Sequence, residues 1–170
     1  FDVLLEERDG RVVAEVRLRR APNGYAADVY LRLPTRFALD IRDTSGDIVV
    51  SDVASLHLVD DSGDIEVTGV PGVVDIEDGS GEIELSRVGP TRVTDDSGRL
   101  RVRGVEGDLH VVHESGDLWI EGVVGAVDVD DGSGSLRCMD VVGSVDLVDG
   151  SGDIWLDRVR GTARITDGSG

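Results

Sequence analysis

Acidic side chains recur at one fixed position in this chain, two residues before a Ser-Gly dipeptide. That position holds Asp43, Asp60, Asp78, Asp95, His113, Asp131, Asp149 and Asp167. Carboxylates beside the carbonyl oxygens of a turn are the ligands that Ca²⁺ prefers. A short acidic side chain also accepts hydrogen bonds from the main-chain N–H groups of its own turn, where glycine supplies the permissive backbone. Turn formation is the leading interpretation of this column, and a calcium ladder is the alternative.

The spacing of the motif argues against a calcium β-roll. That fold repeats Gly-Gly-x-Gly-x-Asp-x-apolar every nine residues. Here the motif returns after 17 or 18 residues, and in Gly150-Ser-Gly-Asp153 the acid comes one residue too early. We therefore predict no specific metal site and keep a calcium-stabilised β-roll as the second reading.

Cations and aromatic rings alternate at another fixed position, four residues after Ser. This column consists of Arg101, Trp119, Arg137 and Trp155. A guanidinium stacked on an exposed indole contributes about 0.5–1 kcal/mol. The column predicts a stabilising ladder on the outer surface. The same four residues are the candidate surface binding site, because an aromatic stripe can also bind a sugar or a partner side chain.

Catalytic chemistry has little support in the sequence. The three histidines, His57, His110 and His113, are expected at outward or corner positions, and no third ligand completes a metal site with His110 and His113. A serine nucleophile needs a unique base beside it, whereas the serines here recur as turn residues. No repeat is long enough to build the walls of a cleft. We predict no enzyme, no catalytic residues and no cofactor.

The elements that position these side chains are set by an internal repeat. The Ser-Gly dipeptide occurs at Ser45, Ser62, Ser80, Ser97, Ser115, Ser133, Ser151 and Ser169. Apolar residues recur six and four residues before Ser and three, five and eight residues after it. Alternation of this kind indicates two strands per repeat, with apolar side chains inward and polar side chains outward.

A unit of about 18 residues fits one turn of a parallel β-coil, in which like residues stack about 4.8 Å apart. A sandwich of hairpins is the alternative, but hairpins do not need the same inward residue at the same phase in each unit. The predicted fold is all-β, a parallel β-helix or β-solenoid with coils of 17–18 residues. In this register Arg99, Arg101 and Arg103 lie between acidic strands, and Cys138 occupies a buried apolar row.

The first part of the chain departs from the repeat. Residues 1–42 are predicted to form an irregular N-terminal β cap with lead-in strands, and residues 43–170 the solenoid, in one continuous domain. A hairpin is expected around Arg8-Asp-Gly10 and a strand over Ala27–Leu33. Such a cap would cover a strand edge that otherwise invites aggregation. Because the repeat motif is interrupted at Gly170, we expect further coils beyond it.

The charge of the chain limits its partners. The formal net charge is −18, from 35 acidic and 17 basic residues. So acidic a surface repels nucleic acid and anionic membrane surfaces. No run approaches the roughly 18 apolar residues that span a bilayer. We predict no nucleic-acid binding and no membrane insertion by this segment.

The recurrent phrase Ser-Gly-Asp-Ile-x-Val, preceded by Val-x-Val-x-Asp, resembles a family of bacterial adhesin-like domains of unknown function. The stretch Val29-Tyr-Leu-Arg-Leu-Pro34 before Leu39-Asp-Ile41 resembles the lead-in of that family. The resemblance implies a single-stranded β-helix in an extracytoplasmic protein of the envelope, periplasm or exterior, with a protein or glycan partner at a cell surface. It implies a structural or adhesive role through an acidic rod surface. A self-assembling β-helical scaffold is a further alternative.

Overall fold

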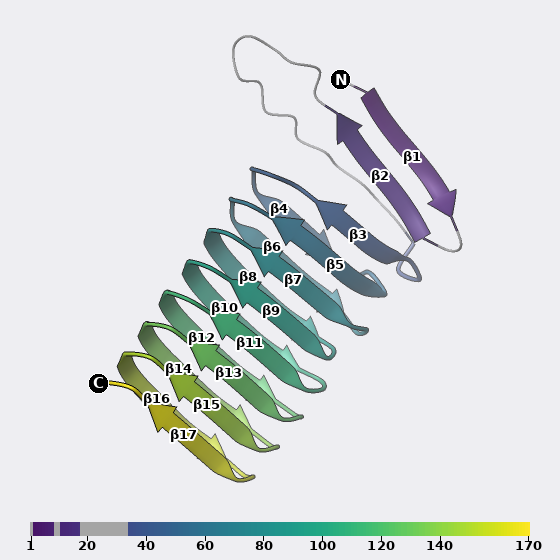
Figure 1. Cartoon of the computed structure of the whole chain (residues 1–170). Coiled ribbons are helices and arrows are strands. Elements are labelled where there is room, and N and C mark those ends of the chain that lie inside the picture. The colour runs from purple at the N-terminus through teal and green to yellow at the C-terminus, as the bar shows by residue number, and fades with distance from the viewer. Residues whose placement is uncertain (1, 9–10, 18–33) are drawn as a thin grey trace.

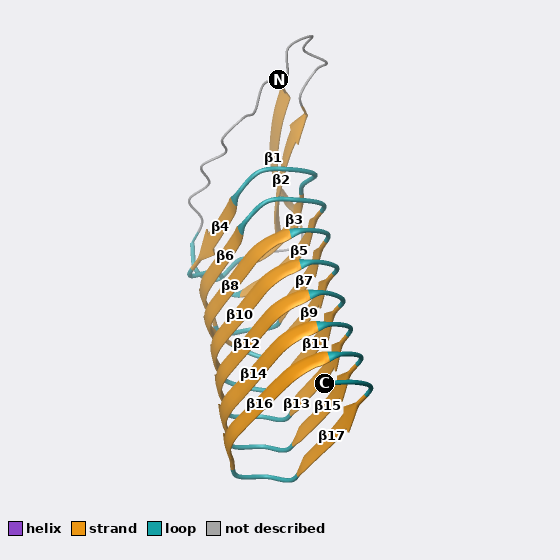
Figure 2. Ribbon diagram, turned by 90° about the vertical axis from the view of Figure 1, so that its left-hand side faces the viewer, coloured by secondary structure: helices purple, strands orange, loops and turns teal. Residues whose placement is uncertain are grey.

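The chain forms a β-solenoid. The computed structural model describes residues 2–8, 11–17 and 34–170, and these residues contain strands and turns but no helix. Two sheets face one another along the length of the coil, and each coil contributes one strand to each sheet (Figures 1 and 2). The predicted fold class is confirmed.

The larger sheet has ten strands in the described residues. In spatial order they are β1 (Asp2–Arg8), β2 (Arg11–Arg17), β3 (Ala38–Arg42), β5 (Ser55–Asp60), β7 (Val74–Asp78), β9 (Thr91–Asp95), β11 (Leu109–His113), β13 (Val127–Asp131), β15 (Val145–Asp149) and β17 (Ala163–Asp167). The other sheet has seven strands. These are β4 (Ile48–Ser51), β6 (Ile65–Val70), β8 (Gly81–Val88), β10 (Gly98–Val105), β12 (Gly116–Val123), β14 (Gly134–Val141) and β16 (Gly152–Val159).

From β3 onward every neighbouring pair of strands is parallel and in the predicted register. Val102 pairs with Ile120, for example, and Glu66 pairs with Glu84. The same register places Arg99 between Glu82 and Asp117. A one-residue slip would turn each apolar row outward, so the burial of these rows fixes the pairing.

The N-terminal segment begins as predicted. Strands β1 and β2 pair antiparallel as a hairpin, and β2 continues the larger sheet by pairing Arg11 with Ala38 and Val12 with Leu39. The hairpin therefore lies beside the edge of β3. The strand predicted over Ala27–Leu33 lies outside the described residues.

The core consists of stacked rows rather than a single cluster. The five predicted apolar rows are buried in the central coils, although members in the last coil such as Ala163 and Ile165 are exposed. Val102, Ile120 and Cys138 are consecutive members of one row with no exposed surface. Burial of each such side chain contributes about 1.5–3 kcal/mol of transfer free energy. The opposite sheet covers these rows from inside the coil and neighbouring coils cover them along the axis, so each coil depends on the next for its stability.

The glycine of each Ser-Gly pair is required by close approach of the backbones. Its N–H donates to the carbonyl oxygen of the serine in the following coil, as from Gly81 to Ser97 at 3.2 Å. A Cβ atom on Gly98 would lie 1.7 Å from the carbonyl oxygen of Gly81, and the φ angle of Gly98 is 144°. No other residue type fits this position without moving the coil.

A bend in the longer strands lies seven residues after Ser. Its residues adopt positive φ angles, and they include the non-glycine residues Asp52, Arg87, Asp140 and Arg158 as well as Gly69, Gly104 and Gly122. The extra residue breaks the alternation, so the valine that follows points inward again.

In the described residues no helix is long and apolar enough to cross a membrane.

Candidate functional sites

The four residues of the predicted surface column come together as a continuous stack on the outer face of the seven-stranded sheet. Arg101, Trp119, Arg137 and Trp155 occupy successive strands β10, β12, β14 and β16 in direct register. The guanidinium carbon of Arg137 lies 5.1 Å from the ring centroid of Trp119 and 5.0 Å from that of Trp155. The Arg101 carbon lies 5.7 Å from the Trp119 ring. These four residues are called the Arg–Trp ladder below.

The two ends of the Arg–Trp ladder differ. Arg101 lies 3.9 Å from the Glu82 carboxylate and is mostly covered. Trp155, in contrast, is 58% exposed. Its neighbours on the same outward face of β16 are Asp153 and Asp157, two residues before and after it. The Trp155 indole is thus flanked by two carboxylates, of which that of Asp157 is paired with Arg158.

The recurring acidic column does not lie on the surface. Its six central members form a file inside the solenoid, each at most 5% exposed: Asp60, Asp78, Asp95, His113, Asp131 and Asp149. Each is paired in register with the next across strands β5, β7, β9, β11, β13 and β15. This set is called the interior carboxylate file below.

The outward or corner position expected for His113 is therefore wrong. The imidazole has no exposed surface, and it lies between two carboxylates of the file. Its Nδ1 atom is 3.0 Å from Oδ1 of Asp131 and its Nε2 atom is 3.4 Å from Oδ2 of Asp95. Burial lowers the pKa of His113, but the contacts with Asp131 and Asp95 outweigh it and raise the pKa to about 9.

The other end of the file holds acids that no side chain compensates. No side chain donates to a carboxylate oxygen of Asp60 or of Asp78, although both residues are buried. The main-chain N–H groups of Ser62 and Ser80 interact with these carboxylates only weakly, since their effect on the pKa is smaller than that of burial. Burial, followed by the charges of Asp95 and Asp60, raises the pKa of Asp78 to about 6. Burial also raises the pKa of Asp60 and of Asp149. A buried carboxylate without donors is costly while it is charged.

The turn-forming role predicted for the column is confirmed at some positions. Oδ1 of Asp95 accepts a hydrogen bond from the Ser97 N–H at 3.0 Å, and Oδ1 of Asp149 accepts one from Ser151 at 3.1 Å. The outward acids two residues after Ser act differently. Oδ1 of Asp64 accepts the N–H of Glu82 in the next coil at 2.9 Å. These oxygens bind the backbone of neighbouring coils.

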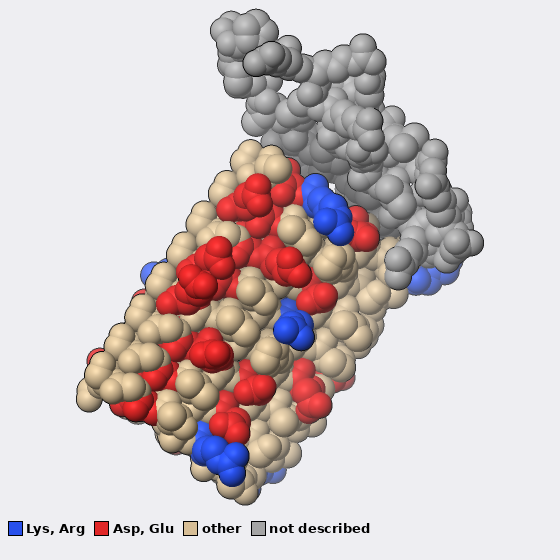
Figure 3. Space-filling view, in the orientation of Figure 1, with Lys and Arg blue, Asp and Glu red and all other residues tan. Residues whose placement is uncertain are grey.

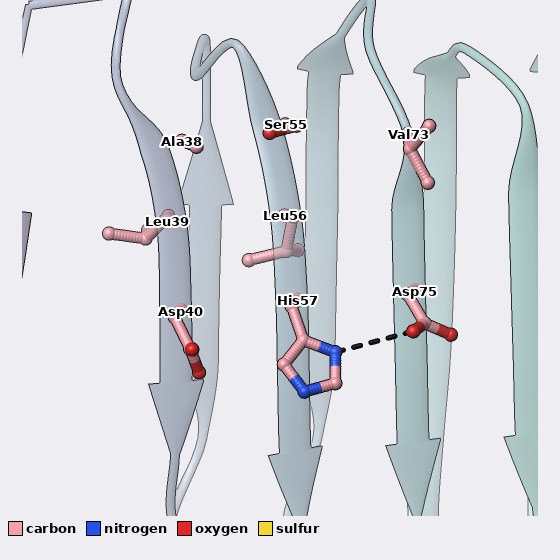
Figure 4. Close-up of a pocket in the computed structure, with 8 residues that line it drawn as sticks. All are labelled: Ala38, Leu39, Asp40, Ser55, Leu56, His57, Val73 and Asp75. Carbon is pink, nitrogen blue, oxygen red and sulfur yellow. Dashed lines mark ion pairs between the residues drawn. The ribbon is translucent and has the colours of Figure 1, made fainter. Parts of the chain in front are cut away.

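The two remaining histidines lie on the outer face of the larger sheet. His57 Nδ1 is 3.3 Å from the Asp75 carboxylate, and His110 Nδ1 is 3.0 Å from that of Asp128. A hollow over β3, β5 and β7 brings Ser55, His57 and Asp75 together (Figure 4). In that view the His57 ring extends away from Ser55, so the three side chains do not form the hydrogen-bonded relay that activates a serine.

Metal-ligating side chains are not gathered into a centre. Within residues 34–170, where side chains are described, no group of three or more His, Cys, Asp or Glu has an arrangement that could hold a metal ion. Cys138 is buried in an apolar row, as predicted, and burial raises the pKa of its thiol to about 12.

The interior position of the acidic file had a signal in the sequence. The acidic position follows the two inward apolar positions of its strand at the same two-residue interval, as in Leu109-His-Val-Val-His113. Strand alternation therefore places it inward. The polar residue type and the adjacent Ser-Gly favoured a solvated turn instead.

Comparison of the chain with protein-family models, curated proteins and solved structures finds no match.

Proposed function

We propose that this chain is a rigid, non-catalytic interaction module of adhesin type in an extracytoplasmic bacterial protein, and that it binds a basic protein surface through the Arg–Trp ladder. The observation that carries the proposal is the Arg–Trp ladder on the outer face of the seven-stranded sheet, in which two indoles already pair with guanidinium groups. The resemblance of the Ser-Gly-Asp-Ile repeat supports the adhesive role and the location.

The shape of the molecule favours a macromolecular partner. Every coil is hydrogen-bonded to its neighbours, and the coils have no long loops that could enclose a small ligand. Flat sheet faces of this kind suit an extended contact with another surface. An aromatic residue with polar neighbours is a common centre of such contacts.

The charges favour a basic partner. Acidic groups dominate the outer face of the larger sheet, where Asp75, Asp128, Asp130 and Asp146 lie (Figure 3). On the opposite face Asp153 and Asp157 flank Trp155. An arginine from a partner can stack on this indole as Arg137 does, while its guanidinium faces the carboxylate of Asp153; that of Asp157 is already paired with Arg158. Long-range attraction to an acidic rod also accelerates encounter.

Titration of the chain with an Arg-Gly repeat peptide, a Lys-Gly peptide of equal charge and a neutral oligosaccharide tests the proposal. We expect the arginine peptide to bind best at physiological ionic strength, because guanidinium stacks on indole better than ammonium does. Trp155→Ala should weaken that binding about three- to tenfold.

The matched control is Val148→Ala, which truncates an exposed apolar side chain on the other sheet. It should leave binding unchanged. Equal affinity of Trp155→Ala and the unmodified chain for the arginine peptide would refute the proposal. Binding of the oligosaccharide alone would replace the basic partner with a glycan.

A further inference from the structure

The interior carboxylate file poses a problem of charge. Neighbouring members follow one another at the spacing of parallel strands, about 4.8 Å. Two ionised carboxylates at this distance repel each other strongly in a low-dielectric interior. Asp60 and Asp78 are 3% and 5% exposed. No side chain donates to their four oxygens, and the main-chain N–H groups near them, those of Ser62 and Ser80 among them, lower their pKa by less than burial raises it. Something positive has to reduce this charge.

No side chain of the described residues supplies that charge to Asp60 and Asp78. The ion pairs of the described arginines are all on the outer surface, and the only cation within the file is His113, which lies beyond Asp95. The other groups near the file are acidic: Asp61 beside Asp60, Asp43 at the N-terminal end and Asp167 at the C-terminal end. The apolar rows fill the rest of the interior.

A proton fits this position better than a metal ion. Ca²⁺ takes six to eight oxygen ligands, and Mg²⁺ needs six in an octahedron. Asp60 and Asp78 offer four oxygens, and the described residues contain no metal-binding group around them. A proton needs no additional space, and it converts one carboxylate into a donor for its neighbour.

We propose that the interior carboxylate file is a proton-binding switch: the Asp60–Asp78 pair takes up a proton, His113 is held as an imidazolium between Asp95 and Asp131, and loss of these protons as the pH rises loosens the central coils. This inference is independent of the proposed binding partner. It concerns the stability of the rod and not its outer face.

Asp78 and His113 both make the fold less stable as the pH rises. The pKa of Asp78 is about 6 in the fold and 3.8 in an ordinary environment, so the folded chain binds the additional proton between these values. The stability of the fold therefore falls as the pH rises from 4 to 6. The pKa of His113 is about 9 against 6.5, so its contribution is present below pH 6.5 and is lost as the pH rises to 9. A protein stabilised by paired surface carboxylates shows the opposite trend in acid.

Thermal unfolding of the whole chain between pH 4 and pH 9 tests the switch, together with Asp78→Asn. Asparagine has the shape of a protonated aspartate and carries no charge. We expect the melting temperature of the unmodified chain to fall with rising pH. Asp78→Asn should remove the part of this fall between pH 4 and 6 and raise the melting temperature at pH 7.5 by roughly 5 °C.

The matched control is Asp130→Asn, which removes the same charge from an exposed position in β13. In this variant the melting temperature should depend on pH as it does in the unmodified chain. That result would show that the effect of Asp78→Asn comes from the interior carboxylate file and not from weaker repulsion among surface acids. A ¹³C titration of the Asp78 carboxyl should show a midpoint near pH 6. A midpoint below 4.5, or an Asp78→Asn variant that is destabilised at pH 7.5 with an unchanged pH slope, would overturn the proposal. The second result would indicate that the carboxylate binds a cation.

Discussion

The Nδ1 atom of His113 lies 3.0 Å from Oδ1 of Asp131 inside the solenoid, where neither side chain has appreciable exposed surface. Histidine takes this place in a column otherwise made of aspartates. An imidazolium on β11 would compensate the acids of both neighbouring coils, Asp95 and Asp131. We therefore expect this interruption of the repeat to stabilise the fold.

Restoring the aspartate of the repeat should therefore destabilise the fold. His113→Asp replaces the cation with a third carboxylate beside Asp95 and Asp131, and loss of one partner of a buried ion pair costs about 3–5 kcal/mol. We expect a loss of this size in urea unfolding at pH 8 and a smaller loss at pH 5, where the carboxyl groups can take up protons. His110→Asp, on the surface beside Asp128, should change stability by less than about 1 kcal/mol. Equal losses for the two variants would contradict the buried ion pair.

The repeat determined most of the fold because each coil buries the same rows. The two strands per repeat, their register and the order of the Arg–Trp ladder follow from apolar alternation at a constant phase. Strand alternation alone would place Asp60, Asp78 and His113 inward, but the residue types argued against it, since charged residues are rarely buried unless they are paired. Pairing between coils becomes visible only when the coils are stacked.

The bend in the longer strands could also be predicted from the sequence only in part. Glycine at Gly69, Gly104 and Gly122 is compatible with a positive φ angle, but the same position holds Arg87 and Asp140. These residues adopt a conformation that costs about 1–2 kcal/mol per residue. Neighbouring coils impose it, so no local propensity predicts it.

Substitutions at Gly98 and Gly104 distinguish a glycine that is required by close contact between coils from one that is required only by its positive φ angle. Gly98→Ala would place a methyl group against the Gly81 carbonyl, so we expect a loss of roughly 4 kcal/mol or more in urea unfolding. Gly104→Ala meets no atom closer than 3.7 Å and should lose only about 1–2 kcal/mol through its positive φ angle. Similar losses for both variants would show that the coils are not in close contact at Ser-Gly.

Cross-linking measures the register directly. Glu66→Cys together with Glu84→Cys places two thiols on paired residues of β6 and β8, within the range of a disulfide. We expect rapid oxidation within one chain, detected by a mobility shift on a non-reducing gel. Cys138 should not compete, because its thiol is buried and has a raised pKa. The control pair, Glu66→Cys with Glu77→Cys, lies on opposite sheets and should stay reduced. Oxidation of both pairs at the same rate would contradict the register.

Calcium should have little specific effect. The outward carboxylates accept main-chain N–H groups, as Asp64 does from Glu82, and the buried ones lie in an apolar interior. Monovalent salt should raise the melting temperature by screening repulsion among the surface acids. Ca²⁺ should then add little beyond Mg²⁺ at the same ionic strength. A Ca²⁺-selective rise of about 10 °C that is lost in Asp131→Asn with Asp149→Asn would instead support a calcium-stabilised β-roll.

The most direct test of the proposed function is a two-dimensional ¹H–¹⁵N NMR titration of the whole chain with the arginine peptide. We expect the largest shifts at the Trp155 indole N–H, at the backbone amides of β16 and at Arg137, while the amides of β13 and β15 on the other sheet keep their positions. Shifts spread evenly over the acids of the larger sheet, with the Trp155 indole unchanged, would contradict a binding face at the Arg–Trp ladder.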